Sequence, residues 1–170
     1  MGRCSNDMRP SDQFASAWQS VLTVRSKPNA IEAVVGWMDA MRRGDLDDAA
    51  GWFHRDVTWK GVPDDAVCRN RDDVVEMLRD SLTPCPDDPR SYEPDEGLRG
   101  AEAVELIAPS PGTVVLGAKV PGLAEIGGMD LGGQLYNVFR VREGRIAAVA
   151  DYALREGALE AAGATPPYWR

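Results

Sequence analysis

The chain has 170 residues, a formal net charge of -8 and 44% hydrophobic residues, which is the composition of one soluble globular domain. The acidic balance argues against nucleic-acid binding, and no apolar stretch reaches the roughly 20 residues of a membrane span. The N-terminus lacks the apolar run of a secretory signal. An odd set of three cysteines therefore predicts reduced thiols in a cytoplasmic protein. A single histidine, His54, excludes a histidine-rich metal site, and we expect no metal.

A polar extension precedes the main domain. Within it, Phe14, Trp18, Val21 and Leu22 fall at helical spacing, which predicts either a short docked helix or a partly ordered tail. No internal repeat is visible. The expected organisation is an N-terminal extension, one domain and a C-terminal tail, over residues 1–27, 28–163 and 164–170.

Three helices are expected at the start of the domain. The first has Asn29 as its N-cap, Glu32 completing a capping box and Gly44 as its stop. The second starts at Asp45 and extends to His54, whose position favours a cation at a helix C-terminus over a catalytic role. The third covers residues 70–82 behind an Asn70 cap. The apolar stripe expected for the first helix consists of Ile31, Val34, Val35, Met38 and Met41.

A run of strands follows these helices, after one short strand, "DVTWKGV", between the second and the third. Pro and acidic residues predict a loop over 83–97, and the glycines of residues 122–133 predict a mobile loop. The order of helices first and antiparallel strands second predicts an α+β fold. The further strands are expected at about 100–107, 113–120, 131–142 and 145–152, before a closing helical segment, "LREGALEAAG".

The hairpin "NVFRVREGRIAAVADY" contains the most informative polar residues. Its "REGR" sequence fits a three-residue turn with a glycine bulge, which would set Leu135 opposite Asp151 and Asn137 opposite Val149. In that register Asn137 and Asp151 share an otherwise apolar face, whereas a two-residue turn would separate them. The opposite face would carry Tyr136, Val138, Ile146, Ala148 and Tyr152.

A carboxylate on an apolar face must find hydrogen-bond partners or give up its charge. Asp151 is therefore a candidate general acid or base, with Asn137 as the residue that orients it. The structural alternative is that Asp151 lies at a strand end and caps the helix that follows.

The order of these motifs resembles the nuclear-transport-factor-two-like superfamily, in its SnoaL-like branch. The resemblance is carried by "MDAMRRGDLDDAAGWFHRDVTWKG", "CRNRDDVVEML" and "LYNVFRVREGRIAAVADYALREGAL". It implies a cone-shaped α+β barrel, in which three helices pack on a curved sheet around a deep apolar pocket. The superfamily includes ketosteroid isomerases, polyketide cyclases, limonene-epoxide hydrolases and non-enzymatic modules, so the fold alone does not fix the activity.

"ADYALRE" is similar to a strand end of the limonene-epoxide hydrolases, which places Asp151 at the position of a catalytic carboxylate. The Tyr and Asn that hold water in those enzymes correspond here to Trp59 and Gly61. Those enzymes also need an Arg and an Asp on a middle strand, where this sequence offers only Lys119. The resemblance therefore disfavours epoxide hydrolysis. The SnoaL-type cyclases, which use an acidic residue and no cofactor, resemble the chain best.

Two functions from different classes remain open. One is a cofactor-independent isomerase, cyclase or hydrolase that acts on a small apolar or polycyclic molecule through Asp151. The other is a non-catalytic ligand-binding or dimerisation module of the same fold. The apolar face opposite Asp151 predicts a homodimer. The residues expected to contact substrate are Trp37, Met41, Trp59, Leu78, Lys119, Leu135 and Phe139.

Overall fold

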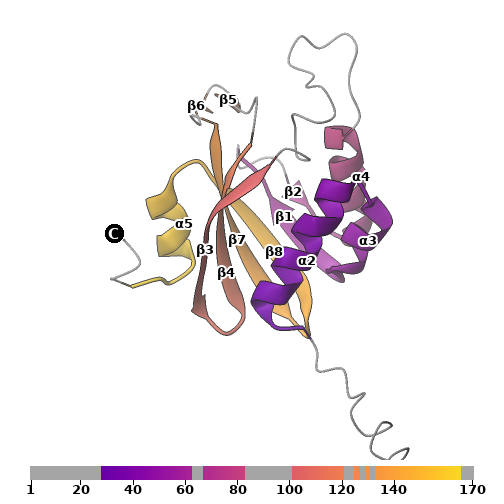
Figure 1. Ribbon diagram of the computed structural model, residues 1–170, viewed down its shortest axis with the longest axis horizontal. Coiled ribbons are helices and arrows are strands. Elements are labelled where there is room, and N and C mark those ends of the chain that lie inside the picture. Colours follow the sequence, from indigo (N-terminus) through magenta and orange to yellow (C-terminus); the bar gives the residue numbers. More distant parts are fainter. Residues whose placement is uncertain are drawn as a thin grey trace, which may run out of the picture.

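The structure is a computed structural model, and its elements are drawn in Figure 1. The expected N-terminal helix, the loop over 83–97 and most of the glycine-rich loop lie outside the residues that it describes. No helix among the described residues is long and apolar enough to cross a membrane. The described residues are 28–62, 67–82, 101–120, 125–126, 129–130 and 133–165.

The first helix ends where its caps predict. The Asn29 side chain accepts the Glu32 backbone N–H, the Glu32 carboxylate accepts the Asn29 N–H, and Gly44 closes the helix at a φ of 68°. The third predicted helix is also confirmed, because the Asn70 side chain accepts the Asp73 N–H. The helices of the described residues are α2 (Ala30–Arg43), α3 (Leu46–Gly51), α4 (Arg71–Leu82) and α5 (Arg155–Ala161).

The second helix is shorter than predicted. It ends at Gly51, and the Trp52 carbonyl already accepts the Ile146 N–H from a neighbouring strand. Phe53 and His54 therefore begin β1 (Phe53–Lys60) instead of ending a helix. The apolar pattern of this segment is too short to separate a helix from a strand, and pairing with another strand decides between them.

Six strands form one curved, open sheet in the order β2-β1-β8-β7-β4-β3. Neighbouring strands are antiparallel except for β1 and β8, which are parallel. A separate short hairpin joins β5 (Glu125–Ile126) and β6 (Met129–Asp130). The remaining strands are β2 (Val67–Cys68), β3 (Glu102–Ser110), β4 (Thr113–Lys119), β7 (Gln134–Arg142) and β8 (Arg145–Tyr152).

Helices cover the two faces of the sheet unequally. Figure 1 shows α2, α3 and α4 together on one side of the sheet and α5 on the other. The main hydrophobic core lies between the sheet and the first three helices, and a smaller cluster lies under α5. This arrangement confirms the predicted α+β fold, with helices packed on a curved, mainly antiparallel sheet.

The apolar stripe predicted for α2 is only partly correct. Val34 and Met41 are buried, but Ile31 and Val35 are 42% and 41% exposed. Trp37 takes a core position in their place, together with the small residues Ala30, Ala33 and Ala40. Small side chains let the helix lie close to the sheet, so the buried face is centred on Trp37.

The outer face of the sheet differs from the prediction at Ile146, which is fully buried in the main core. Tyr136, Val138 and Tyr152 do lie on the outer face, but they pack in the cluster that α5 covers. Much of the apolar surface on which the predicted homodimer rested is thus buried by the chain's own helix. The homodimer itself stays a prediction.

Candidate functional site

The β7–β8 hairpin sets the position of the two polar residues singled out in the sequence. Arg142 pairs with Arg145, and the two residues between them, Glu143 and Gly144, have φ angles of 56° and 76°. Two consecutive positive φ angles define a two-residue turn of type I′. The predicted three-residue turn is therefore wrong.

A β-bulge in the same hairpin returns Asn137 and Asp151 to one face of the sheet. The shorter turn alone would have separated them. The register shifts between Arg140 and Val141, so that Arg140 pairs with Ala148 while Val141 pairs with Ile146. This β-bulge leaves Ala147 as the extra residue on β8. Beyond it, Asn137 pairs directly with Asp151. The two residues lie opposite each other, which is closer than the predicted diagonal arrangement.

Asp151 accepts two hydrogen bonds, one on each carboxylate oxygen. The Asn137 amide donates to Oδ1 at 2.7 Å, and the Trp59 indole N–H donates to Oδ2 at 2.9 Å. Trp59 reaches Asp151 because β1 runs parallel to β8, with Trp59 opposite Val149. The helix-capping alternative is wrong, since Leu154 is the N-cap of α5 and no side chain caps it.

The surroundings of Asp151 change its acidity. Burial raises its pKa from 3.8 to about 6, because an ionised carboxylate loses solvation in the interior. The hydrogen bonds from Trp59 and Asn137 act in the opposite direction, since they stabilise the charged form. A carboxyl group with this pKa is mostly ionised at neutral pH, yet a modest part of the population still carries its proton.

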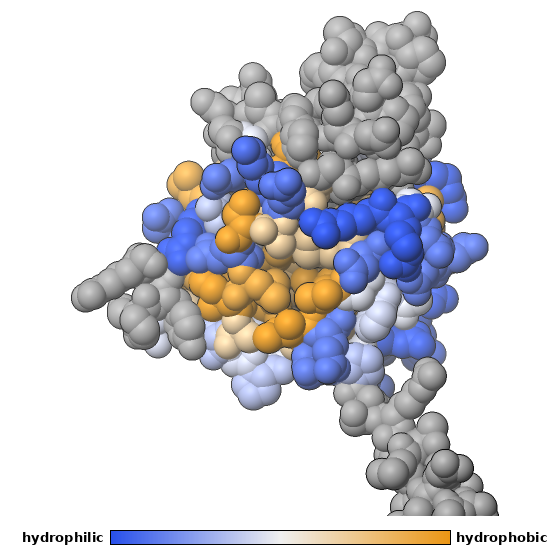
Figure 2. Space-filling view, viewed as in Figure 1, coloured by the Kyte–Doolittle hydropathy of each residue, from blue (hydrophilic) through white to orange (hydrophobic). Residues whose placement is uncertain are grey.

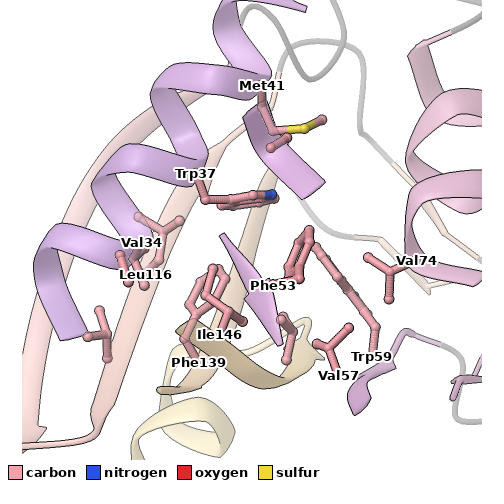
Figure 3. Packing of buried hydrophobic residues seen from close by; sticks show 14 of the residues in the cluster. Val34, Trp37, Met41, Phe53, Val57, Trp59, Val74, Leu116, Phe139 and Ile146 are labelled. Carbon is pink, nitrogen blue, oxygen red and sulfur yellow. The ribbon is translucent and has the colours of Figure 1, made fainter. Parts of the chain in front are cut away.

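The apolar residues predicted to contact substrate gather on the same side of the sheet. Trp37 extends from α2 toward Phe53 and Phe139 in the centre of the core (Figure 3). Its ring lies 5.4 Å from that of Phe139 and 5.8 Å from that of Trp59, between centroids. Met41 and Leu78 are buried in the same cluster. Leu135 is partly buried and, by strand alternation, shares the face of Asn137 and Phe139.

The predicted apolar side chains therefore lie together as expected, but they pack directly against one another. Trp37, Trp59 and Phe139 are each less than a tenth exposed. The Trp37 indole N–H is buried and has no hydrogen-bond partner among the described residues. The deep apolar pocket itself stays a prediction.

Lys119 does not join this group. It is exposed at the end of β4, where it pairs with Gln134. Leu116 and Ala118 of the same strand face the main core, so alternation directs Lys119 to the other side of the sheet. Lys119 thus lies apart from the other residues predicted to contact substrate, and that contact stays a prediction. The causes of the shifted pKa of Asp151 are burial, Trp59 and Asn137, and Lys119 is not among them.

His54 is also remote from Asp151. It lies near the start of β1, and its ring contacts the Arg142 guanidinium at 3.2–3.3 Å. Asp151 lies at the far end of the sheet from this contact, because Phe53 pairs with Ile146 whereas Lys60 pairs with Ala150. The expected helix-end role of His54 is wrong, since the residue belongs to a strand.

Cys68 borders the candidate site from the next strand. It pairs with Trp59 across β1 and β2, and its thiol lies 3.8 Å from the sulfur of Met77. Burial raises the pKa of the Cys68 thiol, and the negative charges of Asp73 and Asp151 raise it further. The thiol is thus held protonated, which favours packing over nucleophilic chemistry.

The hydrogen bond from Trp59 to Asp151 is the functional contact that the sequence did not reveal. Trp59 was predicted as an apolar wall, and its donor group was not assigned a partner. The signal that points to it is the resemblance, in which Trp59 stands at the position of a tyrosine that helps to hold water in the limonene-epoxide hydrolases.

Among the described residues, no three His, Cys, Asp or Glu side chains form a group that could hold a metal ion.

The fold has been seen in several solved structures. A candidate polyketide cyclase from Sinorhizobium meliloti matches 71% of this chain and 93% of its own, with a TM-score of 0.51 and 18% identity. An LEH-like epoxide hydrolase from M. tuberculosis matches 77% of this chain and 90% of its own, with a TM-score of 0.51 and 19% identity. No protein-family model and no curated protein matches the chain.

A designed protein has the same architecture. A de novo protein with a curved β-sheet matches 75% of this chain and 86% of its own, with a TM-score of 0.51 and 14% identity. At these identities the likeness shows a shared fold. The chain thus shares a cone-shaped α+β fold with these structures, which is the fold that its sequence predicted. Because a designed protein shares it, the chemistry must be argued from the site.

Proposed function

We propose that this protein is a cofactor-independent enzyme that transfers a proton with Asp151 on a small, largely apolar molecule. The observation that carries the proposal is the fixed carboxylate: both oxygens of Asp151 accept an N–H donor, beside an apolar core. Trp59 and Asn137 hold the group in one orientation. Each carboxylate oxygen keeps a second lone pair, which is able to accept a proton.

The pKa of about 6 decides in which direction the proton first moves. At neutral pH Asp151 is mostly ionised, so it begins as a base and removes a proton from the substrate or from water. Its conjugate acid then returns the proton at another position. Asn137 suits both states because its amide has a donor end and an acceptor end, whereas Trp59 can only donate.

The reaction class follows from this single carboxyl group. Isomerisation and cyclisation need a base that returns its proton, and neither requires a second charged residue beside the first. Two of the similar structures are a candidate polyketide cyclase and an LEH-like epoxide hydrolase, and a substrate with a large apolar part suits the apolar interior here. Lys119 lies on the other face of the sheet, so it does not pair with the carboxylate.

The rival function is a ligand-binding module without catalysis. The close packing of Trp37, Trp59 and Phe139 favours it, because side chains that fill the core leave less space for a substrate. In this case Asp151 would be a buried polar anchor. Binding would then persist in a variant that lacks the carboxylate.

Two probes test the proposal. The ketone 2-tetralone in deuterated buffer reports proton removal from carbon, and styrene oxide reports activation of water. The protein should accelerate at least one reaction over buffer, and Asp151→Asn should abolish the acceleration. His54→Gln is the matched control, because it changes the single histidine of the chain, whose ring contacts Arg142 and not the site. Equal rates for the wild type, Asp151→Asn and buffer would contradict catalysis by Asp151.

A further inference from the structure

One flank of α2 leaves large apolar side chains in water. Ile31 and Val35 lie one helical turn apart and are 42% and 41% exposed. On the same flank, the Arg42 guanidinium donates to the carbonyl of Ala101 at 3.3–3.4 Å. Ala101 directly precedes β3, so this flank of the helix faces the edge strand of the sheet.

The edge strand offers a matching apolar side chain. Leu106 is 38% exposed and pairs with Leu116, which is buried in the main core. Paired residues project to the same face, so Leu106 lies on the face of the sheet that carries α2. Figure 2 shows a hydrophobic patch that extends over β3 and the N-terminal half of α2. We call Ile31, Val35 and Leu106 the α2–β3 surface.

An exposed apolar surface of this kind is expected to bind another segment or protein. Single exposed apolar residues are normal, but a contiguous patch beside an unpaired strand edge is typical of an interaction site. Glu105, on the other face of β3, is held by Arg155 of α5 at 2.6–2.7 Å, so that face is already occupied. The face toward α2 is the one left without a covering element among the described residues.

We propose that residues 14–22 of the chain's own N-terminal extension dock on the α2–β3 surface. The extension joins the domain at Pro28, one residue before the cap of α2. Pro28 lies six positions after Leu22, and an extended chain over that distance in sequence spans about 20 Å. The segment therefore reaches both Ile31 in the first turn of the helix and the neighbouring strand.

The composition of the segment fits this surface. In a helix, Phe14, Trp18, Val21 and Leu22 would share one side, because their spacing is i, i+4, i+7 and i+8. A helix this short is not stable in water by itself, so its apolar side must pack on something to persist. Docking buries this stripe and the α2–β3 surface together.

Charge favours the same contact. Residues 1–27 carry four Lys or Arg and two Asp or Glu, whereas the rest of the chain carries 15 and 25. A basic segment is attracted to an acidic domain, and the covalent link keeps it close. Charge disfavours a second copy of the chain on this surface, because two acidic domains repel each other.

Fluorine NMR of the full chain tests the proposal. Labelling with 5-fluorotryptophan gives a resonance for each of the five tryptophans, and Trp18→Phe assigns that of Trp18. In the folded wild type, the Trp18 resonance should differ from its position in concentrated urea. Leu106→Glu, and independently Val35→Asp, should move it to the urea position while the Trp37 and Trp59 resonances stay native.

A matched control uses Val67, which is 48% exposed on β2 at the opposite edge of the sheet. Val67→Glu should leave the Trp18 resonance unchanged. A Trp18 resonance at the urea position in the wild type, or one that neither Leu106→Glu nor Val35→Asp moves, would overturn the proposal. A resonance that changes with protein concentration would also overturn it, because a second copy would then occupy the surface.

Discussion

The indole N–H of Trp59 donates to the carboxylate of Asp151 at 2.9 Å, although 92 residues separate the two in sequence. The contact exists because β1 and β8 are parallel neighbours in the centre of an otherwise antiparallel sheet. It joins the aromatic core to the acidic group at its border. Trp59 therefore has two roles, in packing and in setting the acidity of Asp151.

Trp59→Phe should raise the pKa of Asp151 above about 6. The phenyl ring preserves aromatic packing, but the carboxylate loses one of the two donors that stabilise its charge. The pKa is measured from the carboxyl carbon resonance of Asp151 in an NMR titration. Trp37→Phe is the control, because Trp37 packs on the same cluster without a hydrogen bond to Asp151. An unchanged pKa in Trp59→Phe would show that the indole N–H does not act on the carboxylate.

Asp151→Asn should stabilise the protein near pH 8 and have little effect near pH 4. In the unfolded chain the carboxyl group loses its proton at the ordinary pKa of 3.8, but in the folded chain it keeps the proton until about pH 6. Between these values the unfolded state binds fewer protons, so stability falls as pH rises. The loss is on the order of 3 kcal/mol at pH values above 6.

Urea denaturation of the two proteins at both pH values measures this difference. Asp56→Asn is the control, because its side chain is 63% exposed and its charge costs little to solvate. A variant Asp151→Asn that is less stable than the wild type near pH 8 would contradict the raised pKa. The same comparison tests whether the carboxylate is retained at a cost in stability, as in many active sites.

Local signals in the sequence predicted the helices well. Asn29, Glu32 and Gly44 fix the ends of α2 through backbone contacts within a few residues, so they can be read without knowledge of the fold. The end of α3 could not be read in this way. The strand at Phe53 depends on pairing with Ile146, which is 93 positions away in the chain.

The pairing of Asn137 with Asp151 shows the same limit. The shared face was predicted correctly, but for the wrong reason, because a shorter turn and a bulge at Ala147 cancel each other. Neither irregularity has a strong signature in a single sequence. Lys119 could not be placed from the sequence, because its face depends on the register of β4, which only its neighbours in the sheet define.

Gly36→Ala should destabilise the protein by about 1–3 kcal/mol, as overpacking in a core does. A Cβ at this position would lie 2.2 Å from Cζ2 of the Trp52 ring. Helix propensity alone would favour alanine, so a loss identifies the steric contact. The control is Gly51→Ala at the end of α3, where a Cβ meets nothing within 4 Å. Thermal unfolding of both variants tests this, and equal stability of the two would contradict it.

Gly144→Ala should cost more stability than Gly163→Ala. Both glycines have positive φ angles, of 76° and 71°, so alanine introduces backbone strain of about 1–2 kcal/mol at either position. At Gly144 the new Cβ would also lie 2.8 Å from Cδ of Pro28, whereas at Gly163 it meets nothing within 4 Å. Urea denaturation of the two variants measures the difference, and equal losses would mean that the turn and the start of α2 are not in firm contact.

The parallel pairing of β1 with β8 determines when the candidate site can form during synthesis. β8 is the last of the described strands, so Trp59 and Asn137 leave the ribosome before the carboxylate that joins them. Contacts between such distant segments require closure of a long loop, which slows folding. Until β8 is in place, β1 and β7 each have an open edge in the centre of the future sheet. The chain is therefore most exposed to wrong strand pairing just before its candidate site is completed.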